Sequence, residues 1–202
     1  MGFVARSMPP GAEEEAYVRR IEAERIEKDD YFQTHPHSPI PWGVRGRMKG
    51  LEYFPIDPTY SLRVKLARYS KPEPVVLATS KGVPRNMVKS GYFEFTIGGQ
   101  NRRLQVYQSF EPDASLFVPF RDATSGIESY GAARYLDIEE RPTDDYVLDF
   151  NLAYNPYCAY SNDYVCPFPP RENWLDIAIR AGEKDFPYAP SPDLDESTHA
   201  HG

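Results

Sequence analysis

Hydrophobic residues recur at two different periods along the chain, and each period predicts a different kind of element. Over residues 12–32, Val18, Ile21 and Phe32 fall on one side of a helix, with Ile26 at the margin of that side. Apolar positions spaced in this way predict an amphipathic helix that packs one stripe against the rest of the protein.

Charge spacing and proline support the same helix and indicate where it ends. Glu15–Arg19 and Glu24–Lys28 are opposite charges four residues apart in the favourable orientation, and such pairs stabilise an exposed helical face. Three prolines follow within residues 36–41. Because proline cannot continue a helix and restricts the residue before it, this stretch is expected to be an extended connector.

Beyond the connector the hydrophobic period becomes two, which is typical of half-buried strands. Alternation over 62–66 and 92–97, with Gly98-Gly99 turning the chain toward 104–106, predicts a strand and a hairpin. Further strands are expected over 75–79, 115–120, 133–138, 146–154 and 174–179. Many short strands with one leading helix predict a mainly β protein, an antiparallel β-sandwich or barrel with an N-terminal α-helix.

Length and composition suit one globular domain. The chain has 202 residues, of which 41% are hydrophobic and 26% charged, and it is rich in proline (20) and tyrosine (15), as a loop-rich β protein would be. We expect a disordered N-terminus over 1–11, a single β domain over 12–186 that includes the helix 12–32, and a disordered tail over 187–202.

The charge of the chain excludes some classes of partner. A formal net charge of −7 argues against a nucleic-acid partner or an anionic membrane surface, which require clustered Lys and Arg. No apolar run approaches the roughly 20 residues of a membrane span, and the first residues lack the apolar segment of a secretory signal. We therefore expect a cytoplasmic protein.

Four long motifs identify the chain as similar to a known family. They are GLEYFPIDPTY (50–60), LFVPFRDATSGIESYGAARYLD (116–137), LDFNLAYNPYCAY (148–160) and CPFPPRENWL (166–175). On these motifs, and on the opening EKDDYF…HPHSPIPW, the chain resembles the family called domain of unknown function 1684 (DUF1684) of bacteria and archaea. The resemblance spans nearly the whole domain, but it implies no reaction, cofactor or catalytic residue, because none is established for the family.

Polar residues are embedded between strongly apolar runs in the segments 121–135 and 149–173. They are Arg121, Asp122, Tyr130, Arg134, Asn151, Tyr154, Asn155, Glu172 and Asn173. Burying a polar side chain is costly unless it is hydrogen-bonded, so the set forms either a satisfied internal network or a lined ligand site.

Two arginines and an aspartate are the best charged group for a ligand. A guanidinium matches a carboxylate or phosphate with two hydrogen bonds, so Arg121 and Arg134 could hold an anionic or polar small molecule beside Asp122. The alternative is a cross-strand Arg–Asp pair that stabilises the turn between two strands.

A polar strand face and several tyrosines favour a lined pocket. Asp149 and Asn151 share one face of their expected strand, and this face either lines a polar cavity or meets water. Tyrosines 130, 135, 154 and 160 in the same segments can supply apolar area together with a directed hydroxyl. If the site is catalytic, Asp122, Asp149 and Glu172 are the candidate general acids or bases. For Glu172 and Asn173 a role in tying the loop is the alternative.

The positions of cysteine and histidine give only weak support for a metal site or for thiol chemistry. Cys158 and Cys166 are half of a structural zinc site, which a homodimer could complete with four thiolates, or they are two packed thiols. Histidine occurs only at positions 35, 37, 199 and 201, so a catalytic triad would need a base from outside the β core. His35 and His37 are expected to be ordinary loop residues.

Three functions follow from these observations. The first is a small-molecule-binding protein with a polar pocket formed by the 121–135 and 149–173 segments. The second is an enzyme that uses carboxylate acid–base chemistry or cysteine thiol chemistry at the same place. The third is a structural or interaction module in which the polar motifs only stabilise loops.

Overall fold

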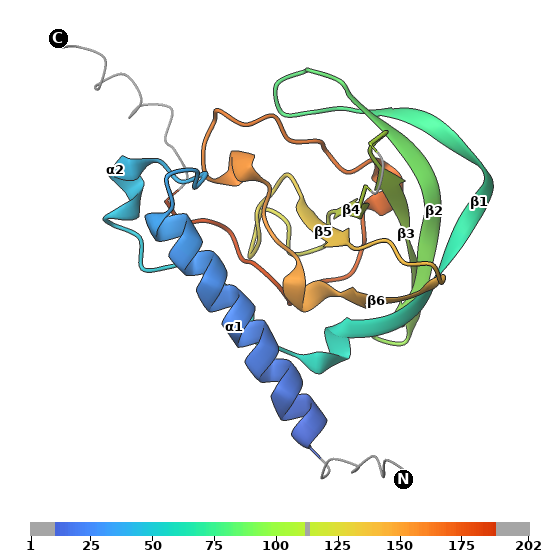
Figure 1. Ribbon diagram of the computed structural model, residues 1–202, viewed down its shortest axis with the longest axis horizontal. Helices are drawn as coiled ribbons and strands as arrows, with labels where there is room; N and C mark the ends of the chain where they lie inside the picture. Colours follow the sequence, from blue (N-terminus) through green and yellow to red (C-terminus); the bar gives the residue numbers. More distant parts are fainter. Residues whose placement is uncertain (1–10, 112–113, 189–202) are drawn as a thin grey trace, which may run out of the picture.

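A computed structural model of the protein describes residues 11–111 and 114–188, and its main feature is one antiparallel β-sheet. The strands are β1 (Ser61–Leu77), β2 (Arg85–Ile97), β3 (Gln100–Gln108), β4 (Leu116–Phe120), β5 (Arg134–Ile138) and β6 (Asp145–Asp149). Their order across the sheet is β5-β4-β3-β2-β1-β6. The sheet curls into a half-barrel (Figure 1), which confirms the predicted mainly β fold with an N-terminal helix.

Helical structure is concentrated at the N-terminus. The helices are α1 (Ala12–Thr34) and the short α2 (Trp42–Arg45), and the single 3-10 turns are Pro58–Tyr60, Phe150–Leu152, Tyr157–Ala159 and Arg171–Asn173. Figure 1 shows α1 on the side of the molecule away from the long β1–β2 hairpin, with irregular segments filling the space between them.

The hairpin between β2 and β3 has the predicted turn. Ile97 pairs with Gln100, and the two residues between them, Gly98 and Gly99, have φ of 56° and 74°. A two-residue hairpin turn of type I′ requires positive φ at both central positions, which glycine adopts without strain. The Gly98-Gly99 signal in the sequence was therefore interpreted correctly.

The segments 62–66 and 75–79, predicted as two strands, belong mostly to the single long strand β1. The register with β2 shifts between Arg68 and Glu73, where a proline-containing stretch bulges out of the ladder. Opposite the bulge, a Cβ atom on Gly91 would lie 2.6 Å from the carbonyl oxygen of Ala67. Only glycine permits this close approach of two backbones, so Gly91 allows β1 and β2 to stay paired on either side of the irregularity.

Helix α1 packs as predicted but is attached through polar side chains as well. Ile21 and Phe32 are buried, whereas Ile26 is exposed, as its marginal position indicated. The expected pair Glu24–Lys28 does not form. Lys28 instead pairs with the buried carboxylate of Glu183, because this residue near the C-terminus of the domain lies beside the helix and would otherwise be a buried charge without a partner.

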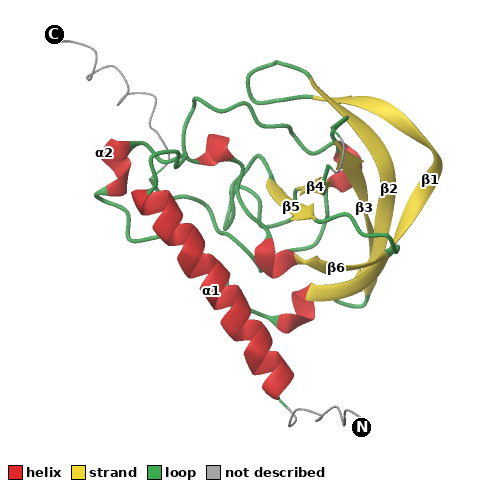
Figure 2. Cartoon of the chain, viewed as in Figure 1, coloured by secondary structure: helices red, strands yellow, loops and turns green. Residues whose placement is uncertain are grey.

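Near the C-terminus one predicted strand is shorter than expected and another is absent. The predicted strand 146–154 stops at Asp149, whose carboxylate accepts the Asn151 N–H and caps a 3-10 turn. Residues 174–179 form no strand, although Leu175 and Ile179 are buried as their alternation predicted. This part of the chain is mostly loop (Figure 2) and bonds to the chain after β4 at only a few positions, so alternating burial arises without a ladder.

The hydrophobic core lies between the concave sheet and this irregular C-terminal segment. It includes residues from all six strands, with Leu175, Ile179 and Ala181 packed against them. A smaller cluster of Leu77, Met87 and Tyr107 is separate from that core. The sheet therefore has apolar groups on both of its faces.

The ends of the chain fall mainly outside the described residues. The disorder expected over 1–11 and 187–202 concerns residues that, apart from Gly11, Pro187 and Tyr188, the structure does not describe. Tyr188 packs against a cluster that includes Phe32 and Phe186. The single domain over 12–186 remains a prediction.

Candidate functional site

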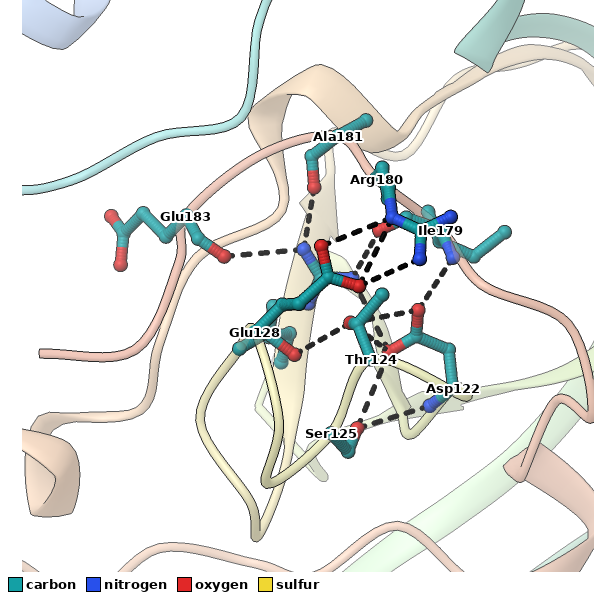
Figure 3. A network of polar contacts seen from close by, with 10 residues as sticks. Asp122, Thr124, Ser125, Glu128, Ile179, Arg180, Ala181 and Glu183 are labelled. Carbon is teal, nitrogen blue, oxygen red and sulfur yellow. Dashed lines mark hydrogen bonds and ion pairs between the residues drawn. The ribbon is translucent and has the colours of Figure 1, made fainter.

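The predicted charged group of Arg134 and Asp122 belongs to a buried network of polar contacts, and Figure 3 shows the part of this network around Asp122 and Thr124. The Arg134 guanidinium is 1% exposed. It donates to the backbone carbonyls of Ile179 (2.7 Å), Glu183 (3.2 Å) and Ala181. These bonds fasten the irregular segment 179–183 to β5.

Asp122 completes the network from the other side. Its carboxylate lies 3.4 Å from the Arg134 guanidinium and accepts the backbone N–H of Ile179 at 2.6 Å and the Thr124 hydroxyl at 2.9 Å. The pair is thus the Arg–Asp alternative foreseen from the sequence. Its carboxylate oxygens and the two terminal guanidinium nitrogens are bonded within the protein, whereas the buried Arg134 Nε has no hydrogen-bond partner. Burial lowers the pKa of Arg134, and Asp122 opposes that shift.

Arg121 and Tyr130 do not join this network. The Arg121 guanidinium lies over the ring of Trp174, 4.6 Å from its centroid. The Tyr130 hydroxyl lies 3.7 Å from the sulfur of Cys158. The structure therefore does not bring the two arginines together around one ligand position.

The polar face of Asp149 and Asn151 meets helix α1 rather than a cavity. Asp149 is 5% exposed and accepts the Tyr17 hydroxyl at 2.9 Å. Asn151 exchanges hydrogen bonds with the backbone of Asp57, at 3.0 Å from the Asp57 N–H and 2.8 Å to its carbonyl. Burial, assisted by Asp149, raises the pKa of Tyr17 above its usual range. These contacts anchor the helix to the end of β6.

Asn173 and Asn155 are also bound to backbone groups. The Asn173 amide receives the Gln105 N–H at 2.7 Å and donates to the carbonyls of Gln105 (2.9 Å) and Pro119 (2.7 Å). Asn155 donates to the carbonyl of Lys184 at 2.7 Å. Both side chains are buried, so each joins an irregular segment to its neighbour.

Glu172 stands apart because it is exposed. It accepts the Tyr107 hydroxyl at 2.9 Å and pairs with Lys89 at 2.7 Å. Its neighbour Asn173 is buried, so the two residues do not form a shared acid–amide site.

A cleft of about 880 Å³ lies elsewhere in the molecule. Ligand sites for small molecules typically fall between about 300 and 1,000 Å³. The walls are the C-terminal half of α1, the β1–β2 turn with the start of β2, the β3–β4 connection with β4, the outer face of β5, and the segment 154–167. Of the predicted site residues, Tyr154 and Cys166 line it.

Tyr135, Asp137 and Tyr154 form the polar wall of this cleft. Side chains alternate along β5, so Tyr135 and Asp137 face the cleft while Arg134 and Leu136 face the interior. The Tyr154 hydroxyl donates to the Asp137 carboxylate, and the Tyr135 hydroxyl donates to the carbonyl of Pro167. A pair of backbone hydrogen bonds between Tyr135 and Tyr154 holds the two residues side by side.

The cleft changes the acidity of these groups. The Asp137 side chain reaches solvent through the open cleft, yet the protein atoms crowded around it raise the pKa of its carboxyl above the ordinary value, and the Tyr154 hydrogen bond opposes that shift. Burial also raises the pKa values of Tyr135 and Tyr154, so both hydroxyls stay protonated and can donate.

Cys158 and Cys166 form a thiol pair at the edge of the cleft. The Cys158 N–H donates to the sulfur of Cys166 at 3.2 Å, and both cysteines are free. Hydrogen bonding from Cys166, aided by Tyr130 and Ser80, lowers the pKa of the Cys158 thiol to about 7, whereas the same contact raises the pKa of Cys166. Cys158 is therefore the thiol that ionises near neutral pH.

Metal ligands do not converge in the part of the chain that the structure describes. His35 and His37 are loop residues whose rings are tilted by 44° with centroids 5.5 Å apart. Within residues 11–111 and 114–188, no group of three or more His, Cys, Asp or Glu side chains is arranged to hold a metal ion.

Sequence reasoning missed Asp137 and Lys28 as cleft residues. The available signal for Asp137 was its spacing of two from Tyr135, which puts both on one face of β5. Lys28 and Phe32 of α1 are far in the chain from the other lining residues, which begin at Thr79, and no local pattern could have placed the helix there.

Comparisons with known proteins agree with the motifs. A family model described as protein of unknown function (DUF1684) matches residues 47–184. The chain is also similar to an uncharacterized protein of Haloarcula marismortui whose structure was solved by NMR in solution. The two are 38% identical, the match covers 86% of this chain and 97% of that one, and the TM-score is 0.67.

Two further findings are negative. No curated protein matches the chain, and no helix among the described residues is long and apolar enough to cross a membrane. With a family match over 47–184 that includes most of the half-barrel, the chain belongs to the family of proteins of unknown function DUF1684.

Proposed function

We propose that this protein is a cytoplasmic small-molecule-binding protein and that its ligand occupies the cleft between β5 and the segment 154–167. The observation that carries the proposal is the polar wall of Tyr135, Asp137 and Tyr154 in a cleft of about 880 Å³. These three polar side chains are hydrogen-bonded within the protein, and unlike Arg134 or Asn173 they also border the open space of the cleft.

The remaining walls suit an organic ligand with an apolar body. Phe117, which packs against Tyr135, and Met87 contribute apolar surface, and the contacting pair Phe32 and Tyr157 contributes more. Ligand sites combine such surface with a few directed polar groups that orient the ligand. The location differs in part from the sequence-based proposal, because Tyr135 and residues 154–167 contribute while Arg121 and Arg134 do not line the cleft.

A cleft-filling substitution tests this proposal. Ser115 lines the cleft and is exposed, so Ser115→Trp should occupy the space without removing an internal contact. Ser70 is exposed in the β1 bulge and does not line the cleft, which makes Ser70→Trp a matched control. A library of small aromatic compounds would be screened by ligand-observed NMR against the three proteins.

We expect compounds that bind the wild type and Ser70→Trp but not Ser115→Trp. The proposal fails if no compound binds the wild type, or if the compounds that bind do so equally well to Ser115→Trp.

Thiol chemistry at Cys158 and Cys166 is the second candidate function. It is favoured by the lowered pKa of Cys158, about 7, and by the position of Cys166 in the cleft wall. A thiolate at neutral pH is the nucleophilic form of cysteine. This candidate is excluded if a Cys158→Ala, Cys166→Ala double variant retains whatever turnover is found with a cleft ligand.

A further inference from the structure

The Asp137 carboxylate is the cleft feature that discriminates most strongly between ligands. It accepts one hydrogen bond, from Tyr154, and no Lys or Arg side chain among residues 11–111 and 114–188 forms a salt bridge with it. By contrast, Asp122, Asp149 and Glu183 each have a cationic partner. A carboxylate crowded by protein and without a cation gains most from a positively charged ligand group.

The other charges on the cleft do not cancel this preference. Lys28 is committed to Glu183, a carboxylate outside the cleft lining. Arg85 and Glu111 are both exposed and of opposite sign. The charge of Lys28 is cancelled by Glu183, and those of Arg85 and Glu111 cancel each other. The net formal charge that the cleft presents to a ligand is therefore the negative charge of Asp137.

Aromatic rings surround the carboxylate at angles that expose their faces. The Tyr135 ring packs against Phe117 at 4.8 Å between centroids and 73° between planes, and against Tyr154 at 5.8 Å and 89°. Rings packed edge to face leave a π face open at the corner between them, and such faces attract cations. The protein already uses this attraction here, because the Lys28 ammonium lies 4.9 Å from the centroid of Tyr154.

We propose that the cleft selects an organic cation, a protonated amine or quaternary ammonium group carried on an apolar or aromatic body. The cationic group would lie against Asp137 and the ring of Tyr135, and the body would pack on Phe117 and Met87. This inference rests on the proposed function and adds the charge of the ligand, which sequence reasoning had expected to be anionic or polar.

Three probes of nearly equal size separate charge from shape. Phenyltrimethylammonium carries a permanent positive charge, tert-butylbenzene is its neutral isostere, and benzoate is a small aromatic anion. Dissociation constants would be measured by NMR titration at one ionic strength and at pH 7.5. The cation should bind about tenfold or more tightly than the neutral isostere, because a desolvated cation–π contact and a nearby carboxylate each contribute to its affinity.

Asp137→Asn should remove most of that preference. Asparagine can still accept the Tyr154 hydrogen bond, so the fold is preserved while the charge is lost. Glu139→Gln is the matched control, since Glu139 is exposed near the same strand, does not line the cleft and carries the same charge. It should leave the affinity for phenyltrimethylammonium within about twofold of the wild type, because an exposed charge that does not line the cleft acts on the ligand through water, where its interaction is weak.

The outcomes distinguish this inference from the function on which it rests. The inference is overturned if tert-butylbenzene or benzoate binds as tightly as the cation or more tightly. It is also overturned if Asp137→Asn keeps the preference for the cation. In both cases the cleft would still bind a ligand, but one of another class. If none of the probes binds although the Ser115→Trp screen yields cleft-specific compounds, the inference also fails. A screen without cleft-specific compounds overturns the proposed function itself.

Discussion

The two faces of strand β5 show what separates a structural polar network from a candidate binding site. On one face, Arg134 is 1% exposed and is bonded to three backbone carbonyls and Asp122. On the other face, three residues away along the strand, Asp137 borders a cleft and accepts one hydrogen bond from a side chain. A polar group whose hydrogen bonds are all made inside the protein stabilises the fold, whereas one that borders open space is free to meet a ligand.

This comparison predicts that substitutions on the two faces of β5 act on different properties. Changes around Arg134 should alter the free energy of unfolding, and changes around Asp137 should alter ligand binding. The thiol pair belongs to the cleft side of this comparison, since Cys166 lines the cleft.

The largest expected effect is that of Arg134→Ala. Removing the guanidinium leaves the Asp122 carboxylate buried without its partner and frees the carbonyls of residues 179–183, which should cost about 3–5 kcal/mol of unfolding free energy. Urea denaturation followed by circular dichroism would measure the loss. As a control, Arg121→Ala removes an arginine stacked on Trp174 and should cost at most about 1 kcal/mol. A loss of less than about 1 kcal/mol for Arg134→Ala would contradict the comparison.

A smaller loss of stability is expected for Asn173→Ala. This change leaves the Gln105 N–H and two carbonyls without their side-chain partner in a buried position, and the expected cost is about 2–3 kcal/mol. The same urea experiment applies. Glu172→Ala, at the exposed neighbouring position, should change the unfolding free energy by about 0.5–1 kcal/mol, because its pair with Lys89 is at the surface. Equal losses of unfolding free energy for Asn173→Ala and Glu172→Ala would show that burial of the Asn173 amide does not determine its contribution to stability.

The thiol pair should reveal itself in the pH dependence of alkylation. With a pKa of about 7 for Cys158, its reaction with iodoacetamide should rise with pH through neutrality and level off above pH 8, because only the thiolate reacts. Cys166→Ala removes the hydrogen bond that stabilises this thiolate, so the profile should move to higher pH. Mass spectrometry of peptides identifies the modified residue. Preferential modification of Cys166 at pH 7 would refute the assignment.

The smallest expected change in stability is that of Asp137→Asn. The carboxylate has no cationic partner to lose, and the amide can keep the Tyr154 hydrogen bond, so the unfolding free energy should stay within about 0.5 kcal/mol of the wild type. Because the pKa of Asp137 is raised in the folded protein, any stability it contributes is complete at low pH and is lost as pH rises through that pKa. The free energy of unfolding of Asp137→Asn, relative to that of the wild type, should therefore be higher at neutral pH than at low pH.

A clear destabilisation by Asp137→Asn at pH 7 would place Asp137 with Arg134 among the structural residues. It would remove the distinction between the two faces of β5.

Local patterns in the sequence were sufficient for much of the fold. The period of 3.6 found α1, the period of two found most strands, and Gly98-Gly99 located the β2–β3 turn, because each of these signals acts between residues close in the chain. The same logic failed over 174–179. Alternating burial there comes from packing against the core, and a pattern of burial does not reveal whether a neighbouring strand is present to form a ladder.

The candidate site was predictable only in part. The sequence identified polar residues that must be satisfied or exposed, and Tyr154 and Cys166 among them do reach the cleft. It could not separate those two from Arg134 or Asn173, because hydrogen-bond partners such as the carbonyls of Ile179 and Pro119 are backbone groups, and every residue carries them.

The sequence by itself thus determined the class of fold, the family and the set of polar residues that require an explanation. Only the tertiary structure decided which of them are satisfied internally and which border the cleft, and it alone brought Lys28 of α1 to the same cleft as Asp137 of β5. The physical reason is that periodicity reports the environment of one side of an element. A site is formed by several elements, and their juxtaposition depends on contacts between residues far apart in the chain.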